Sequence, residues 1–156
     1  CIDSNSRLQY ATDILKNNTA TYLDEFRIIG DAIDILDAPV VNLKIKFVVS
    51  VMSKFNKQNV VSNAIQRLKR NLRIESMQID QPINISELES TIQFTEGVNS
   101  VVSFEIENVT GESNSLNYIG TPYSIVENIV DRMLYPPIGG IFEVRYPNND
   151  IKGSAS

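Results

Sequence analysis

The stretch DQPINISELESTIQFTEGVNSVVSFEI, residues 80–106, predicts a short helix that leads through one glycine into a strand. Asn84 is the expected N-cap residue, because Glu87 stands three positions later, where its side chain can reach back to the main-chain amide of the cap. Gly97 is suited to the left-handed conformation that ends many helices. No side chain in this stretch suggests catalysis.

Strands are predicted where apolar and polar residues alternate, because successive side chains of a strand point to opposite faces. The clearest case is LKIKFVVSV, residues 43–51. Residues 98–109 form a second case, in which Val102, Phe104 and Ile106 are expected to be half-buried. Shorter strands are expected at residues 33–35, 74–79 and 141–147.

Amphipathic helices are predicted where apolar residues recur at intervals of three and four. Besides the capped helix above, we expect one at residues 59–72, with Asn59 as its N-cap, and one at residues 123–134, preceded by Thr121 and Pro122 as N-cap and first-turn pair. Residues 7–17 carry a weaker helical pattern that the polar stretch NNTAT interrupts. A short helix is also the alternative to the strand at residues 33–35.

The predicted elements alternate between strand and helix after the first part of the chain. Helices of this length can cover only one face of so small a sheet, which predicts a two-layer α+β domain with a small mixed sheet and about three helices. We assign residues 1–36 to a partly helical N-terminal lead-in, the end of a larger protein cut at Cys1, and residues 37–156 to the α+β domain. The other face of the sheet then meets water or another chain.

Composition argues against several classes of function. The chain has 156 residues, a formal net charge of −5 and no histidine. Nucleic-acid binding is disfavoured because it requires an excess of basic residues, and no apolar run approaches the roughly 20 residues that span a bilayer. Cys1 is the only cysteine, so the chain can form no internal disulfide and no cysteine-based metal site, and an intracellular origin is favoured.

Candidate catalytic groups are few. Without histidine the chain lacks the most common general base and a common metal ligand. Asp31, Asp34 and Asp37 recur every three residues and could bind a hard cation on a helix, but we interpret them as solvated carboxylates. We therefore expect a protein that is not an enzyme, with no catalytic residue, no cofactor, no metal site and no small-molecule substrate.

Three segments follow one another as GDAIDILDAPVVNLKIKFVVSV, AIQRLKRNL and MQIDQPINISELESTIQFTEGVNSVVSFEI. In this order they resemble the baseplate J-like family of contractile phage tails, with DQPINISELESTI and EGVNSVV most similar to the family pattern. The closing sequence YIGTPYSIVENIVDRMLYPPIGGIFEVRYPNNDIKGSA is similar to the C-terminal end of wedge proteins of T-even-type phages. The sequence departs from the family pattern at Asp80 and Gln81, where a glycine is common.

The resemblance implies a structural protein of the virion, located in the tail baseplate and present in the host cytoplasm during assembly. Its partners would be copies of itself, in a homodimer or a ring, and other baseplate wedge proteins, with no nucleic acid and no membrane insertion. The alternative function is a regulatory domain that binds a small ligand, cut from a larger enzyme, because a two-layer α+β scaffold carries many functions.

The stretch LYPPIGGIFEVRY, residues 134–146, is the candidate interface. Its prolines and glycines fix the approach to the last predicted strand, which is expected at a sheet edge where another chain can pair. Tyr135, Ile138, Phe142 and Tyr146 supply aromatic and apolar groups of the kind that dominate interfaces. For Phe142 the alternative is the domain's own core, so the contact is assigned mainly to Tyr135 and Ile138.

Overall fold

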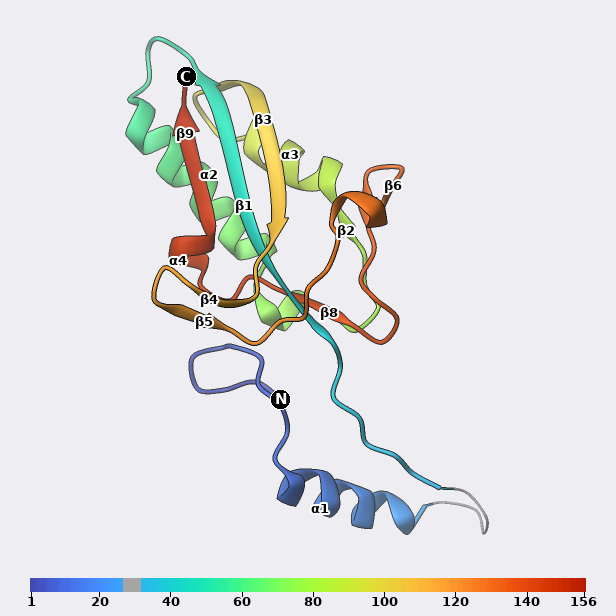
Figure 1. Ribbon diagram of the computed structural model, residues 1–156. Coiled ribbons are helices and arrows are strands. Elements are labelled where there is room, and N and C mark those ends of the chain that lie inside the picture. Colours follow the sequence, from blue (N-terminus) through green and yellow to red (C-terminus); the bar gives the residue numbers. More distant parts are fainter. Residues whose placement is uncertain (27–31) are drawn as a thin grey trace.

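The computed structural model describes residues 1–26 and 32–156, and Figure 1 shows their arrangement. They form the expected α+β fold with a mixed sheet. The helices are α1 (Asp13–Asp24), α2 (Lys57–Asn71), α3 (Ile85–Gln93) and α4 (Pro147–Asp150), with 3₁₀ turns at Ile74–Ser76 and Val126–Asn128. The strands are β1 (Val40–Val51), β2 (Ile83–Asn84), β3 (Val98–Asn108), β4 (Gly111–Ser113), β5 (Leu116–Tyr118), β6 (Ile129–Val130), β7 (Met133–Leu134), β8 (Ile141–Glu143) and β9 (Ile151–Ala155). None of the described helices is long and apolar enough to cross a membrane.

Strand β1 is the centre of the main sheet. It pairs antiparallel with β3 along one side, and on its other side it pairs in parallel with β8 near its start and with β9 farther along. Leu43, Ile45 and Phe47 are buried on one face of β1, as their alternation predicts. The strand predicted at residues 43–51 is confirmed, and it begins earlier, at Val40.

Helices α2 and α3 cover one face of the main sheet (Figure 1). Their buried residues that join the core are Val60, Ala64, Leu68, Ile85, Leu88 and Ile92. Strand β9 approaches the same core at Gly153, where an added Cβ would overlap the ring of Phe47. The helical layer is therefore built from two of the described helices, not from the three that the sequence predicted.

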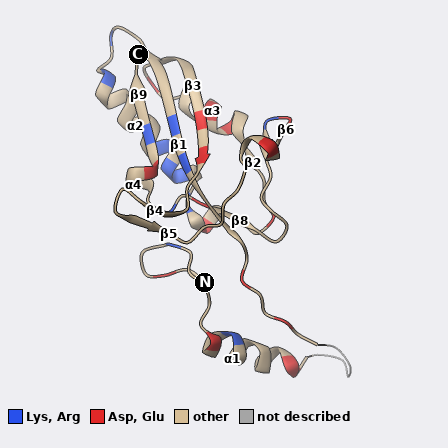
Figure 2. Ribbon diagram, in the orientation of Figure 1, with Lys and Arg blue, Asp and Glu red and all other residues tan. Residues whose placement is uncertain are grey.

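In the part of the chain that the structure describes, the opposite face of the sheet is covered only near the start of β1. There the hairpin of β4 and β5 and the first segment of the chain lie against it, and farther along the face is open (Figure 1). Figure 2 shows basic residues on β1 and β9 and acidic residues on β3. Lys46 of β1 forms an ion pair with Glu107 of β3 at 2.8 Å. The open face is thus a charged surface that water can solvate.

The predicted start of α3 is confirmed. Asn84 caps the helix, and its side-chain oxygen accepts from the main-chain N–H of Glu87 at 3.3 Å. Gly97 has the expected positive φ, 90°, but it lies in the turn before β3 because α3 ends several residues earlier. The predicted N-cap of α2 is wrong, since Asn56 rather than Asn59 accepts hydrogen bonds from the first turn.

The helix predicted at residues 123–134 is wrong. A single 3₁₀ turn forms there, followed by the hairpin of β6 and β7. Asp131 and Arg132 make the two-residue turn of this hairpin with φ of 50° and 65°, the left-handed values that a type I′ turn requires. Because β7 also pairs with β2, hydrogen bonds to a distant segment replace those of the predicted helix.

Four predicted strands differ from the structure. Residues 74–79 hold a 3₁₀ turn instead of a strand, and residues 33–35 belong to no described helix or sheet. Strand β3 is present, but it has a bulge at Val102, which is 59% exposed where alternation predicted a half-buried side chain. The strand predicted at residues 141–147 ends at Glu143, and the polar tail beyond it forms α4 and β9.

Within the lead-in, helix α1 projects from the domain (Figure 1). Helix α1 runs through the stretch NNTAT, which was expected to interrupt it, and buries none of its residues. Asp37 accepts from the ammonium of Lys16 at 2.6 Å and from the main-chain N–H of Ala11 at 3.3 Å. The bond from Lys16 lowers the pKa of Asp37. Asp31 lies outside the described residues, and no group of acidic residues suited to a metal ion occurs among the described ones.

Candidate interaction surface

Two of the four predicted interface residues lie at the surface. Ile138 is 98% exposed and Tyr135 is 46% exposed, and both lie in the connection between β7 and β8. Fully burying an isoleucine side chain contributes roughly 1.5–3 kcal/mol. A fully exposed isoleucine is therefore a candidate contact if the loop that carries it is ordered.

The loop that carries Ile138 is held in one conformation. Gly140 donates its main-chain N–H to the carbonyl of Pro137 at 2.7 Å, and Gly139 has a φ of 70°, as the third position of a type II turn requires. Asp80 accepts from the N–H of Gly139 at 2.6 Å and donates its own N–H to the carbonyl of Gly140 at 2.9 Å. The turn at Asp80 thus fixes this loop from a distant part of the sequence.

The hairpin of β6 and β7, which precedes the loop, is fixed to α3. Arg132 at its turn forms an ion pair with Glu89, and the main-chain N–H of Ile85 donates to the carbonyl of Arg132 at 2.9 Å. Val126 and Val130 on this segment are 84% and 56% exposed. The capped helix therefore supports a segment whose apolar side chains face outward. We call the following residues the apolar rim: Val126, Val130, Tyr135 and Ile138.

The other two predicted interface residues are not free. Phe142 is 1% exposed, and its ring centroid lies 6.5 Å from that of Tyr123. Its assignment to an interface is therefore corrected. Phe142 fills the domain's own core, which was the alternative given for it. The hydroxyl of Tyr146 donates to the carbonyl of Asn117 at 2.9 Å, and its ring packs edge-on against Tyr118. Tyr146 therefore holds the hairpin of β4 and β5 on the domain.

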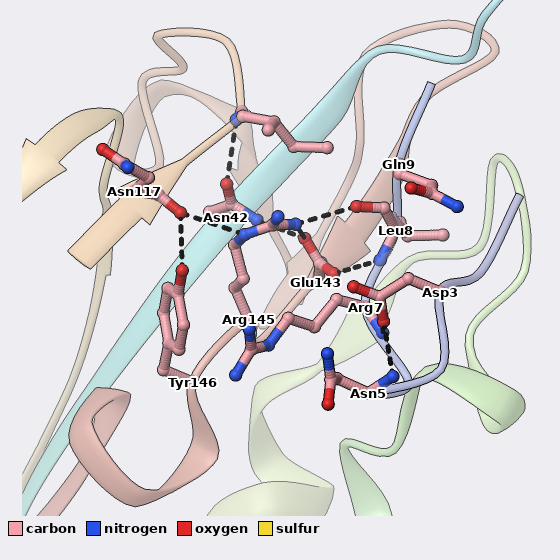
Figure 3. Close-up of polar contacts among 12 residues, drawn as sticks. Asp3, Asn5, Arg7, Leu8, Gln9, Asn42, Asn117, Glu143, Arg145 and Tyr146 are labelled. Carbon is pink, nitrogen blue, oxygen red and sulfur yellow. Dashed lines mark hydrogen bonds and ion pairs between the residues drawn. The ribbon is translucent and has the colours of Figure 1, made fainter. Parts of the chain in front are cut away.

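A buried polar cluster around Glu143 fixes the start of the chain to the domain (Figure 3). Glu143 is 2% exposed, and one of its oxygens accepts from the main-chain N–H of Leu8 at 2.6 Å. The other oxygen accepts from Asn42 at 2.7 Å and from Arg145 at 3.3 Å. Arg145 also donates to the carbonyl of Leu8 at 2.8 Å. We call Asn42, Glu143 and Arg145 the anchor, since together they hold both main-chain groups of Leu8.

The anchor was not predicted from the sequence. Alternation along residues 141–147 placed Glu143 and Arg145 on the solvent side of a strand. The only feature of the sequence that pointed to the anchor was that these two residues carry opposite charges on one face of that strand. In the structure both faces of β8 are covered: Phe142 belongs to the main core, while Ile141 belongs to a smaller cluster against which Leu8 packs. Covering the second face buries the charged pair.

A hollow of about 250 Å³ lies at the end of the open sheet face, lined in part by Lys44, Lys46 and Lys152. Asp150 on its wall is 1% exposed and accepts from the hydroxyl of Tyr118 at 2.6 Å. Burial raises the pKa of Asp150, whereas the hydrogen bond from Tyr118 and the nearby lysines oppose this rise. Burial and the neighbouring carboxylate also raise the pKa of Tyr118. Glu107 and Asp150 also line the hollow, and Lys46 is paired with Glu107, so Lys44 and Lys152 are the groups that could attract a small anion.

Comparison with known proteins leaves the family open, since no protein-family model and no curated protein matches the chain. The interpretation of the surface therefore rests on its residues and geometry. Of the features described above, the apolar rim is best suited to contact another molecule, because its side chains are exposed and its loops are held by hydrogen bonds.

Proposed function

We propose that this chain is a structural subunit of a contractile phage tail baseplate, located in the virion and assembled in the host cytoplasm. It associates with further copies of itself and with neighbouring wedge proteins around the tail tube. The apolar rim is the observation that carries this proposal, because its side chains are 46% to 98% exposed. The sequence resemblance to the baseplate J-like family supports the same function.

The supports of the apolar rim suit a joint in a large assembly. Binding costs less conformational entropy when the contacting backbone is already ordered. Asp80 ties the loop of Ile138 to the turn before α3, and Arg132 ties the hairpin to α3 itself. The rim is thus connected to α3 and to the turn before it, as we expect of a subunit that helps to signal sheath contraction.

Light scattering of the full chain over a concentration series tests self-association. We expect the mass of the wild type to rise with concentration, and the Tyr135→Asp/Ile138→Asp variant to show a clearly smaller rise with an unchanged melting temperature. Val102→Asp is the matched control, because Val102 is also exposed but lies in the bulge of β3. A wild-type chain that stays monomeric even with wedge proteins present contradicts the proposal.

A second function, small-ligand binding by a regulatory domain, is favoured by the lysine-lined hollow alone. A thermal-shift screen with nucleotides and acidic amino acids distinguishes the two functions. A saturable rise in melting temperature that Lys152→Ala abolishes supports ligand binding. Lys57→Ala, which removes a lysine outside the hollow, is the control and should leave the rise intact.

A further inference from the structure

The outer edge of β9 is open beside an apolar groove. Among the described strands β9 pairs only with β1, and a groove of about 440 Å³ between β9 and α2 is lined in part by Val61 and Ile65. The N–H of Ser156 donates to a carbonyl of β1. Because the main-chain groups of successive strand residues point alternately to the two sides, those of Gly153 and Ala155 point toward the open edge. An edge of this kind accepts an added strand.

A segment with the sequence of a strand lies outside every described sheet. Ile33 and Ile35 alternate with Asp34 and Leu36, the pattern from which a strand was predicted. In the structure these residues run between α1 and β1 without pairing, and Leu36 is 85% exposed. The segment therefore lacks the sheet partner that its pattern favours.

The charges of the open edge and of this segment are complementary. Lys152 of β9 lies directly opposite Lys46 of β1, and like charges on neighbouring strands repel each other. Lys46 is paired with Glu107, but Lys152 has no hydrogen bond or ion pair in the described part of the chain. Asp34 has none there either. If a strand were added at the edge with Ile33 and Ile35 facing α2, Asp34 would point to the opposite face of the sheet, where Lys152 lies.

We propose that residues 32–36 of one copy add as a strand to the open edge of β9 in a second copy. Ile33 and Ile35 then pack into the groove against α2, and Asp34 neutralises Lys152 on the opposite face. This inference rests on the proposed self-association and names the segment and the surface that make one of its contacts.

The geometry of β1 explains why the exchange occurs between copies. The main-chain N–H of Ile141 donates to the carbonyl of Pro39 at 2.9 Å and fixes the chain at the start of β1. From this point residues 32–36 lead away from the sheet, whereas β9 lies alongside the later part of β1 (Figure 1). The segment therefore does not lie within reach of the groove of its own copy.

Disulfide trapping between two differently tagged populations of the full chain tests the exchange. In a Cys1→Ser background, one population carries Leu36→Cys and the other carries Ser154→Cys, both at exposed positions. Parallel addition brings these Cβ atoms to roughly 5 Å, close enough for a disulfide after oxidation with copper phenanthroline. Ala32→Cys replaces Leu36→Cys to test antiparallel addition. Val102→Cys, on the other edge strand of the main sheet, is the matched control for Ser154→Cys.

We expect one of the two mixtures to give a covalent heterodimer well above the control mixture. Adding Asp34→Lys to the first population should lower the yield by up to about fivefold, and adding Lys152→Glu to the second should restore it. If the chain associates by light scattering but forms no heterodimer above the control, the exchange is wrong and the proposed function stands. If the chain does not associate at all, both are wrong.

Discussion

Replacing Glu143 with leucine removes the acceptor that holds the first segment of the chain. The main-chain N–H of Leu8, the amide of Asn42 and the guanidinium of Arg145 all lose a hydrogen-bond partner. The side chain of Arg145 is only 12% exposed, so water cannot fully replace the lost carboxylate. The Glu143→Leu variant therefore leaves a charge in a largely buried position.

The size of the effect follows from this burial. Removing one partner of a buried ion pair costs about 3–5 kcal/mol. A domain of this length loses roughly 2–4 °C for each kcal/mol, so the melting temperature of Glu143→Leu should fall by about 6–20 °C. The first segment should also become more accessible to proteases, because Leu8 is held through the anchor.

Thermal unfolding by circular dichroism and limited proteolysis of the full chain measure the two effects. Glu105→Gln, at an exposed position of β3, is the matched control and should stay within about 0.5 kcal/mol of the wild type. Glu143→Leu combined with Arg145→Met should lose less than the sum of the single losses, because both charges leave together. A loss for Glu143→Leu below about 1 kcal/mol, with unchanged proteolysis, would refute the anchor.

Three further changes test other parts of the fold. Tyr118→Phe removes the donor to a buried oxygen of Asp150 and should cost about 1.5–3 kcal/mol near neutral pH. Without this hydrogen bond the pKa of Asp150, already raised by burial, rises further, so the folded variant takes up a proton more readily. The loss of unfolding free energy should therefore shrink as pH falls. A loss that grows in acid contradicts this. Gly153→Ala pushes a methyl group into the ring of Phe47 and should cost about 1–3 kcal/mol, and a wild-type melting temperature would rule out the close approach. Asn84→Ala removes the N-cap of α3 and should cost about 1 kcal/mol in urea unfolding, whereas an unchanged midpoint would argue against the cap.

The main layer was predictable because local pattern and tertiary environment agree there. The alternation of residues 43–51 matches a strand with one face against the helices, and the cap at Asn84 is satisfied within its own helix. Boundaries were less predictable. Asn56 and Asn59 are the same residue type, and either could have capped α2. The bulge in β3 depends on its register with β1, which no local pattern encodes.

The remaining elements depend on segments that are distant in the sequence. Residues 123–134 have helical spacing, but their hairpin pairs with β2 and is tied to α3 by Arg132. Glu143 is buried because Leu8 and its neighbours cover the second face of β8. The exposure of Tyr135 and Ile138 agrees with their assignment to the surface, and their contact with another chain stays a prediction.

Assembly with wedge proteins is the most direct test of the central claim. The tagged full chain is co-expressed with the other wedge proteins of a contractile-tail baseplate, and the products are examined by electron microscopy and native mass spectrometry. We expect the wild type and Val102→Asp to enter rings, and Tyr135→Asp/Ile138→Asp to remain folded but excluded. A rim variant that enters rings as readily as the wild type contradicts the role of the apolar rim, and a wild-type chain that enters no assembly contradicts the proposed function itself.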